Sequence, residues 1–90
     1  MNTHAINIVQ ALKSRGLRVS FAESCTGGMA SAAITAVEGA SEVLDLSLTV
    51  YADWAKVEYT DVTEEILAVH GAVSAQTAQL MASGIRKRGF

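Results

Sequence analysis

The sequence predicts an α/β fold in which a small parallel sheet is flanked by helices. Segments with helical and strand-like periodicity alternate in the order helix, strand, helix, strand and further helices. Strands that are separated by a helix pair in parallel within an α/β layer. Half of the 90 residues are hydrophobic, so a chain that forms one domain at most has many apolar side chains to bury.

The first half of the chain predicts two helices with a strand between them. Thr3 caps a first helix, which ends at Gly16, because glycine is common at helix C-termini. The apolar face of this helix, at spacing i, i+3, i+4 and i+7, consists of Ala5, Ile8, Val9 and Leu12. Residues 17–22 predict a short strand. Thr26 caps a second helix that stops near Gly39, and its lack of charge predicts burial on most sides.

The second half predicts one more strand and then helices. Residues 46–51 alternate apolar and hydroxyl side chains, which indicates a strand, and residues 52–57 indicate a helical turn. Thr63 caps a short helix that ends at Gly71, and Ser74 caps a last helix. The sequence contains no good candidate for a third strand, and an isolated pair of strands is only marginally stable. We therefore expect oligomerisation to complete the sheet.

The acidic residues are concentrated in the middle of the chain. Eight of the nine lie between Glu38 and Glu65, where Lys56 is the only basic residue, and the other basic residues flank this segment. We expect the acidic middle to pair with the basic ends, within one chain or between two copies. The basic run 86–88 is typical of a solvated helix C-terminus, so we expect no nucleic-acid partner.

Composition excludes several other classes of protein. No apolar run approaches the ~20 residues of a membrane helix, and the N-terminus lacks the layout of a signal peptide. We therefore expect a cytoplasmic location without a membrane partner. Cys25 is the single cysteine, so no internal disulfide can form. His4 and His70 stand alone in the sequence, and we expect no metal site.

Residues 22–28, Ala-Glu-Ser-Cys-Thr-Gly-Gly, give the strongest functional signal. They lie between a predicted strand and a predicted helix, where a small nucleophile is exposed beside free backbone N–H groups. Gly27 and Gly28 allow a ligand to approach the backbone closely. Such a segment can hold an anion or an oxyanion, although a Gly-Gly pair often marks only a turn.

Four motifs together resemble the CinA C-terminal domain family, whose members are described as nicotinamide mononucleotide deamidases. They are residues 22–28, Gly39-Ala40-Ser41, Tyr51-Ala52-Asp53-Trp54-Ala55-Lys56 and His70-Gly71-Ala72-Val73-Ser74. Their order and spacing follow the family over nearly the whole chain. The chain departs from the family at Asp53 and Trp54, where the family has Asn and Glu, and at residues 46–48, where a Gly-Gly pair is usual.

The resemblance also implies the extent of the fold. It implies a three-layer α/β unit that is truncated to a small sheet flanked by helices and completed by oligomerisation. Residues 1–90 would form a single domain that corresponds to the N-terminal half of the family domain. The family loop Thr-Gly-Ile-Ala-Gly-Pro, which closes the site, belongs to the other half. We therefore expect the activity of this chain to be weak or absent.

The resemblance implies that Ser24 is the nucleophile for the carboxamide of nicotinamide mononucleotide, assisted by Tyr51 and Lys56. A lysine can act as a base when desolvation lowers its pKa. The expected ligand-binding residues are the neighbours of the nucleophile in the loop, Glu23, Cys25, Thr26, Gly27 and Gly28. The reaction needs no metal or organic cofactor, and the expected partners are the nucleotide and further copies of the chain.

Structural interpretations of the same residues remain open. Ser24 can be a loop hydroxyl that bonds nearby backbone, Cys25 a small buried hydrophobe and Lys56 a surface lysine. Trp54 either stacks on a ring or covers surface that the other half of the family domain would cover. The chain is therefore either an amidohydrolase or a non-catalytic short paralogue that acts as an oligomeric nucleotide-binding or interaction module.

Overall fold

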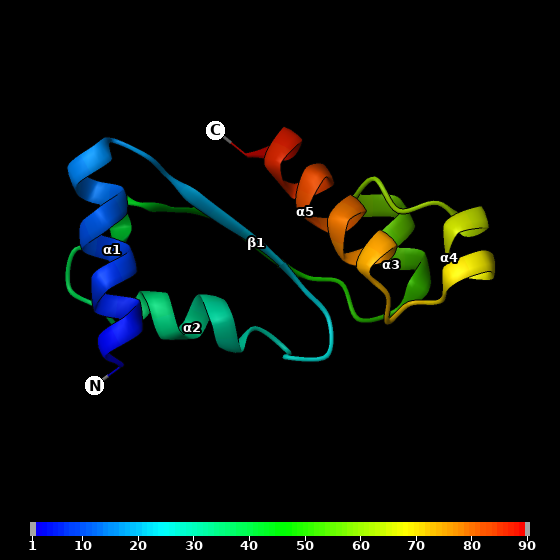
Figure 1. Ribbon diagram of the computed structural model, residues 1–90, viewed down its shortest axis with the longest axis horizontal. Coiled ribbons are helices and arrows are strands. Elements are labelled where there is room, and N and C mark those ends of the chain that lie inside the picture. Colours follow the sequence, from blue (N-terminus) through cyan, green and yellow to red (C-terminus); the bar gives the residue numbers. More distant parts are fainter. Residues whose placement is uncertain (1, 90) are drawn as a thin grey trace.

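The computed structural model describes residues 2–89 and shows an α/β unit with extents of 40 × 24 × 17 Å. The elements are α1 (Thr3–Arg15), β1 (Val19–Glu23), α2 (Met29–Thr35), the 3₁₀ helix η1 (Ala40–Glu42), β2 (Leu44–Thr49), α3 (Asp53–Tyr59), α4 (Glu64–His70) and α5 (Ala75–Arg88). Figure 1 shows α1 and α2 at one end of the molecule and α3, α4 and α5 at the other, with the strands running between them. The predicted order of elements is confirmed.

The two strands pair in parallel and form the whole sheet within the described residues. Phe21 lies opposite Ser47, and Glu23 lies opposite Thr49. The register is irregular between Val19 and Phe21, where the Leu46 N–H donates to the Ser20 hydroxyl at 3.3 Å. The second strand therefore begins and ends two residues earlier than the sequence predicts, because its apolar alternation extends back to Leu44.

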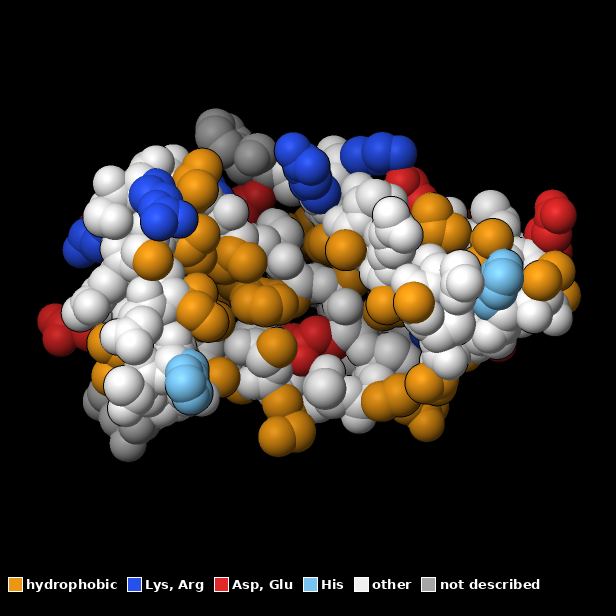
Figure 2. Space-filling view, in the orientation of Figure 1, with side chains coloured by type: hydrophobic (Ala, Val, Ile, Leu, Met, Phe, Trp, Pro, Cys, Tyr) orange, Lys and Arg blue, Asp and Glu red, His pale blue; other side chains and the backbone are white. Residues whose placement is uncertain are grey.

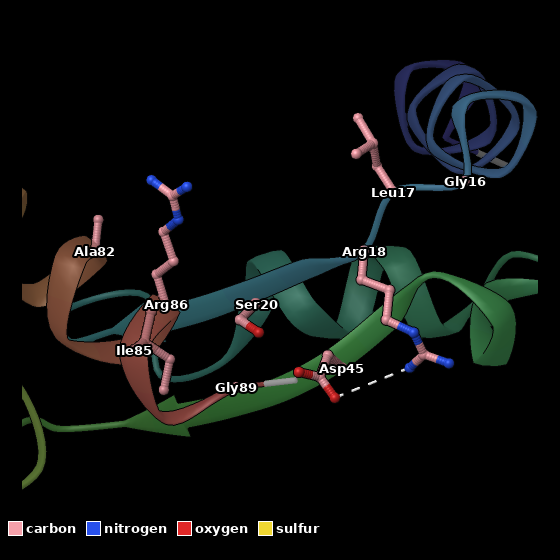
Figure 3. A pocket seen from close by; sticks show the side chains of 9 residues that line it. All are labelled: Gly16, Leu17, Arg18, Ser20, Asp45, Ala82, Ile85, Arg86 and Gly89. Atoms are coloured by element: carbon pink, nitrogen blue, oxygen red, sulfur yellow. Dashed lines mark ion pairs between the residues drawn. The ribbon is translucent and has the colours of Figure 1, made fainter.

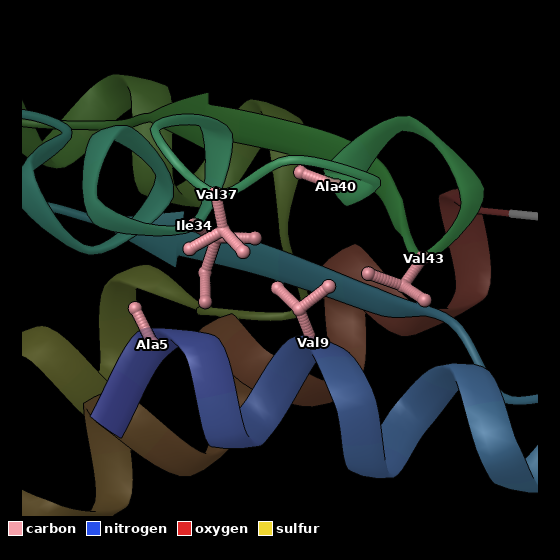
Figure 4. Packing of buried hydrophobic residues seen from close by; sticks show 6 residues of the cluster. All are labelled: Ala5, Val9, Ile34, Val37, Ala40 and Val43. Atoms are coloured by element: carbon pink, nitrogen blue, oxygen red, sulfur yellow. The ribbon is translucent and has the colours of Figure 1, made fainter. Parts of the chain in front are cut away.

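One hydrophobic cluster packs α1, α2 and η1 on one face of the sheet. Its buried members are Ala5, Val9, Ile34, Val37, Ala40 and Val43. Figure 4 shows Ala5 and Val9 on α1 pointing toward Ile34 and Val37. Phe21 packs against this cluster from β1. Each buried valine or isoleucine here contributes roughly 1.5–3 kcal/mol relative to an exposed side chain.

A second cluster covers the opposite face of the sheet. Val50, Ala55, Val62 and Met81 are its buried members. Ala22 and Leu48 pack against it from the two strands. Since successive strand residues point to opposite faces, Phe21 and Ala22 assign the two clusters to opposite sides of β1. Helices thus cover both faces, with α1 and α2 on one side and α5 on the other.

The helix ends follow the sequence in most cases. The Thr63 and Ser74 hydroxyls accept the N–H groups of Ile66 and Thr77 at 3.1 Å, as N-caps do. Gly16 ends α1 with φ 65°, a left-handed conformation that glycine adopts without strain. The predicted first cap is wrong by one residue, because the side chain of Asn2 is the acceptor.

The prediction that the second helix is buried on most sides is wrong. α2 has seven residues, and Ile34 is its only buried side chain. Met29, in its first turn, is 72% exposed. The segment lacks charge because it consists mostly of alanine and small polar residues. These side chains are partly or fully exposed to solvent.

The acidic middle of the chain pairs with its own basic ends. Lys13 Nζ lies 2.9 Å from Glu42, and Lys87 Nζ lies 2.7 Å from Asp61. The Arg18 guanidinium lies 3.9 Å from Asp45. Three of the acidic residues are therefore paired with the basic ends within one folded chain.

Candidate functional site

The carboxyl ends of both strands meet at the predicted site. The Val50 N–H donates to the Glu23 carbonyl at 2.7 Å, so the chain leaves the two strands side by side. After β1 the chain continues into residues 24–28, which we call the Ser24 loop. Shortly after β2 it reaches Tyr51. A parallel sheet places its binding crevice at this edge, where loops leave the carboxyl ends of the strands.

The Ser24 loop is a turn that depends on its two glycines. The Gly27 N–H donates to the Ser24 carbonyl at 3.0 Å. Gly27 has φ 65° and Gly28 has φ 105°, conformations that residues with a Cβ rarely adopt. A Cβ on Gly28 would also lie 3.4 Å from the Thr49 hydroxyl oxygen. The Gly-Gly pair therefore shapes the loop and lets it lie against the end of β2.

Glu23 anchors the loop to the first turn of α2. Its side chain is buried, and its carboxylate accepts hydrogen bonds from the Ala30 N–H at 2.8 Å and the Ser31 N–H at 3.0 Å. The hydroxyls of Thr26 and Ser31 donate to it at 2.7 and 2.9 Å. Burial raises the pKa of the Glu23 carboxyl, but the hydrogen bonds from Ser31, Thr26 and Ala30 outweigh it and lower the pKa to about 2.

This carboxylate takes the place of the expected helix cap. We predicted that Thr26 caps α2, but the N-cap position is Gly28, and the Thr26 hydroxyl donates to Glu23. The N–H groups of α2 that an external anion would contact are thus occupied by Glu23. Within residues 2–89 the N–H groups of Cys25, Thr26 and Gly28 make no hydrogen bond. These three donors are available to a ligand.

Lys56 is the second buried charged residue at this edge. Its side chain is 2% exposed, and Nζ donates to the Tyr51 carbonyl at 2.5 Å. Asp53 lies 3.5 Å from the same nitrogen. The alternative that Lys56 is an ordinary surface lysine is therefore wrong. Among the described residues, Glu23 and Lys56 are the charged side chains that are buried.

The structure brings Ser24, Tyr51 and Lys56 to one edge but does not connect their side chains. Within residues 2–89 the Ser24 hydroxyl forms no hydrogen bond, and Lys56 Nζ contacts Tyr51 through its carbonyl. The Tyr51 side chain is 72% exposed. The Ser24 hydroxyl is therefore not bonded to nearby backbone, and it is not yet paired with a base.

Other residues of this edge are placed as follows. Cys25 is an exposed free thiol, so its interpretation as a buried hydrophobe is wrong. Trp54 is 68% exposed, and its ring contacts that of Tyr59 at a centroid distance of 6.3 Å. Sequence reasoning missed the roles of Ser31 and Asp53. The position of Asp53 three residues before Lys56 was a usable signal, whereas the contact between Glu23 and Ser31 depends on how the loop turns.

A hollow of about 610 Å³ lies away from the Ser24 loop. Its walls are formed by residues 16–18, by Ser20 and Asp45 of the strands, and by the last turns of α5. Figure 3 shows Leu17 and Arg18 on one side and Ala82, Ile85 and Arg86 on the other. This hollow is at the amino ends of the strands, opposite the predicted site, and we do not assign the chemistry to it.

In residues 2–89, no three His, Cys, Asp or Glu side chains are grouped in a way that could hold a metal ion. None of the helices in this range has the length and hydropathy needed to cross a membrane.

Comparison with known proteins identifies the family. The profile of the CinA C-terminal domain matches residues 1–89. A CinA-like protein of Anaeromyxobacter sp. strain K is 50% identical over 82 residues, which are 91% of this chain and 20% of the relative. A putative competence-damage inducible protein of Caldicellulosiruptor bescii is 48% identical over 77 residues, 86% of this chain and 19% of the relative.

Solved structures agree with this assignment. The competence/damage inducible protein CihA from Agrobacterium tumefaciens aligns with TM-score 0.91 and 42% identity, over 94% of this chain and 52% of that chain. The competence damage-inducible protein A from Klebsiella pneumoniae aligns with TM-score 0.92 and 40% identity, over 98% and 56%. The chain thus spans about half of the solved relatives and about a fifth of the curated ones. It belongs to the CinA C-terminal domain family.

Proposed function

We propose that the chain is a nicotinamide mononucleotide amidohydrolase-like protein that hydrolyses a carboxamide with Ser24 as the nucleophile. The observation that carries this proposal is the burial of two charged side chains, Glu23 and Lys56, at the strand edge where the Ser24 hydroxyl makes no hydrogen bond within residues 2–89. Buried ionisable groups are common at functional sites. The membership in the CinA family supports the same chemistry.

The proposed reaction proceeds through an acyl-enzyme. Ser24 Oγ attacks the carboxamide carbon while its proton passes to a base, for which Lys56, with Tyr51, is the candidate. The free N–H groups of the Ser24 loop stabilise the negative oxygen of the tetrahedral intermediate. The carbon–nitrogen bond then breaks, the proton leaves with ammonia, and water hydrolyses the ester to a carboxylate.

The geometry explains why we expect weak or absent turnover from the chain alone. The Lys56 amino group is held at the Tyr51 carbonyl and not at the Ser24 hydroxyl. The tyrosine ring and Trp54 are largely exposed, so these side chains lie in water. Exposure to water weakens the electrostatic interactions that a transition state needs.

A second candidate is a non-catalytic short paralogue that binds a nucleotide or a protein. The absence of a bond between Ser24 and any base within residues 2–89 favours it. We also infer a homo-oligomer, because eight large hydrophobic side chains are exposed among residues 2–89, from Ile8 to Val73. Light scattering that finds only a folded 9.5 kDa monomer would overturn the oligomer.

Ammonia release from nicotinamide mononucleotide separates the two functions. An amidohydrolase releases ammonia at a rate that falls to background in Ser24→Ala. The matched control is Ser41→Ala, which removes an exposed hydroxyl outside the loop and leaves the rate unchanged. Binding of the nucleotide without ammonia release supports the non-catalytic paralogue, and ammonia release that survives Ser24→Ala contradicts the role of that serine.

A further inference from the structure

We propose that Asp53 is a positioning residue, whose carboxylate holds the Lys56 amino group at the Tyr51 carbonyl. In this position the amino group makes no hydrogen bond to the Ser24 hydroxyl. The contact itself is argued from the fold, whereas its effect on turnover rests on the proposed function. Three observations lead to it: the burial of the amino group, the hydrogen bonds that already saturate Glu23, and the place of Asp53 in α3.

The Lys56 amino group is buried and has one charged partner. The side chain is 2% exposed, and a buried ammonium loses the water that would solvate its charge. Nζ donates to the Tyr51 carbonyl at 2.5 Å and lies 3.5 Å from Asp53 Oδ1. The carbonyl is neutral, so it satisfies one donor but does not balance the charge. Within residues 2–89, Asp53 is the one carboxylate that forms an ion pair with Lys56.

Glu23, the other buried charged side chain, does not compete for this amino group. Each of its carboxylate oxygens already accepts two hydrogen bonds. Oε1 accepts from the Thr26 hydroxyl and the Ala30 N–H, and Oε2 accepts from the N–H and the hydroxyl of Ser31. A carboxylate has about four lone-pair sites, so Glu23 has none left for Lys56. The charge balance of Lys56 therefore depends on its ion pair.

The other basic residues leave Asp53 to Lys56. Figure 2 shows the lysine and arginine side chains of this face gathered mainly over the C-terminal ends of α1 and α5. There they pair with other acids, as Lys13 does with Glu42 at 2.9 Å. In the part of the chain that the structure describes, Asp53 pairs with no cation other than Lys56. The loss of either member would thus leave the other without a charged partner.

Asp53 and Lys56 lie three residues apart in α3. Residues at this spacing are neighbours on a helix surface, and an acid that precedes a base is the favourable order. The Asp53 side chain is 65% exposed, so the pair runs from the interior to the surface. Tyr51, which supplies the carbonyl, lies two residues before Asp53. The amino group is therefore held between two points at the N-terminal end of α3.

This position of the amino group works against the proposed reaction. A base has to lie about 3 Å from the hydroxyl whose proton it takes, or reach it through one water molecule. The Ser24 hydroxyl has no hydrogen bond within residues 2–89, while the Lys56 amino group is bonded at the start of α3. To reach Ser24, Nζ has to leave the Asp53 carboxylate. Removing that charge should therefore release Lys56 for the role of base.

A simpler role for Asp53 has to be separated from this one. Asp53 is the acidic residue in the first turn of α3, where a negative charge stabilises a helix. The N-cap residue, Ala52, makes no side-chain hydrogen bond that could cap the helix. If Asp53 only stabilised α3, its loss would loosen the whole helix, and Lys56 would become accessible together with the backbone.

Acylation of lysines by acetic anhydride measures whether the Lys56 amino group is held. Mass spectrometry after a short pulse gives the labelled fraction of Lys56, with Lys13 as the internal reference. Asp53→Asn keeps the shape of the side chain and removes its charge. In this variant Lys56 should be labelled about two- to fivefold faster, the effect of one lost ion pair with an exposed acid. Glu58→Gln, at an exposed carboxylate of the same helix, is the matched control with unchanged labelling.

Two further measurements exclude loosening of the helix. Hydrogen exchange reports on the Lys56 N–H, which donates to the Ala52 carbonyl at 3.2 Å, and on the Thr60 N–H, which donates to the Lys56 carbonyl at 3.0 Å. Both amides should exchange as slowly in Asp53→Asn as in the unmodified chain. Asp53→Glu retains the charge, so it should keep the labelling of Lys56 slow.

Ammonia release from nicotinamide mononucleotide tests the consequence for turnover. Asp53→Asn should raise kcat about two- to fivefold and leave KM unchanged, because the ion pair acts on the base and not on the substrate. A change in KM alone would mean that Asp53 acts on the charge of the substrate. Glu58→Gln removes one negative charge from the same helix and should change neither constant.

Four results would overturn the proposal. They are unchanged labelling of Lys56 in Asp53→Asn, labelling that rises together with amide exchange, lower ammonia release from this variant, and a change in its KM alone. Faster labelling without ammonia release from either protein would support the positioning role of Asp53 and contradict the amidohydrolase. A failure of the ion pair is therefore distinguishable from a failure of the proposed function.

Discussion

The carboxylate of Glu23 accepts both the backbone N–H and the hydroxyl of Ser31, at 3.0 and 2.9 Å. These two bonds, together with those from Thr26 and Ala30, attach the end of β1 to the first turn of α2. The Ser24 loop is the short connection between these two fixed points. Its shape is therefore determined by Glu23, the residue that precedes Ser24.

Removing the Glu23 charge should destabilise the protein. In Glu23→Gln an NH₂ group replaces one oxygen of the carboxylate. It faces N–H and O–H donors, and these buried donors lose their acceptor. We expect the free energy of unfolding to fall by about 2 kcal/mol. Urea denaturation measures it, and Glu38→Gln, at an exposed carboxylate, is the matched control with no loss. Equal stability of both variants would contradict the anchoring role of Glu23.

Acid should destabilise the protein through the same carboxylate. The pKa of Glu23 is lowered from 4.5 to about 2 in the folded state, so the unfolded chain takes up the proton first as the pH falls. The stabilisation is therefore complete above pH 4.5 and is lost progressively between pH 4.5 and about 2. Denaturation at a series of pH values should show this loss, and Glu23→Gln should reduce it. An identical acid loss in the variant would contradict the assignment.

Gly84 should tolerate no side chain. An added Cβ on this buried residue would overlap the backbone of Asp61 and lie 2.5 Å from Thr60 Cα, so α5 could not approach the loop before α4. We expect Gly84→Ala to cost about 3 kcal/mol or more, within the range of overpacked cores. Gly89→Ala is the control, because its Cβ meets side-chain oxygens that can move. Thermal unfolding compares them, and similar losses would contradict the packing of α5.

Lys56 should matter more for turnover than for folding. Lys56→Met keeps an unbranched side chain in a buried position and removes the amino group that contacts Tyr51 and Asp53. We expect the unfolding free energy to change by less than about 1.5 kcal/mol, while ammonia release falls to the level of Ser24→Ala. Lys13→Met, at an exposed lysine, is the control for both measurements. Undiminished ammonia release would exclude Lys56 as the base.

The sequence predicted the order of elements well because the signals were local. Gly16, Thr63 and Ser74 each bond within one turn of their helix, so their roles can be read from neighbouring residues. The cap of α2 could not be predicted in this way. It comes from Glu23, seven residues before Ala30, and depends on the path of the Ser24 loop between them.

The candidate site was predicted in composition but not in its contacts. The motifs placed Ser24, Tyr51 and Lys56 at the ends of the two strands, and the parallel pairing brings those ends together. The sequence could not show that Lys56 would turn its amino group toward the Tyr51 carbonyl. That choice depends on burial around α3, which is a property of the folded chain.

The central claim is that Ser24 is the nucleophile of the proposed amidohydrolase site. The most direct measurement is ammonia release from nicotinamide mononucleotide by the unmodified chain and by Ser24→Ala. We predict slow release above background from the unmodified chain and background release from the variant. Equal release from the two proteins would contradict the claim.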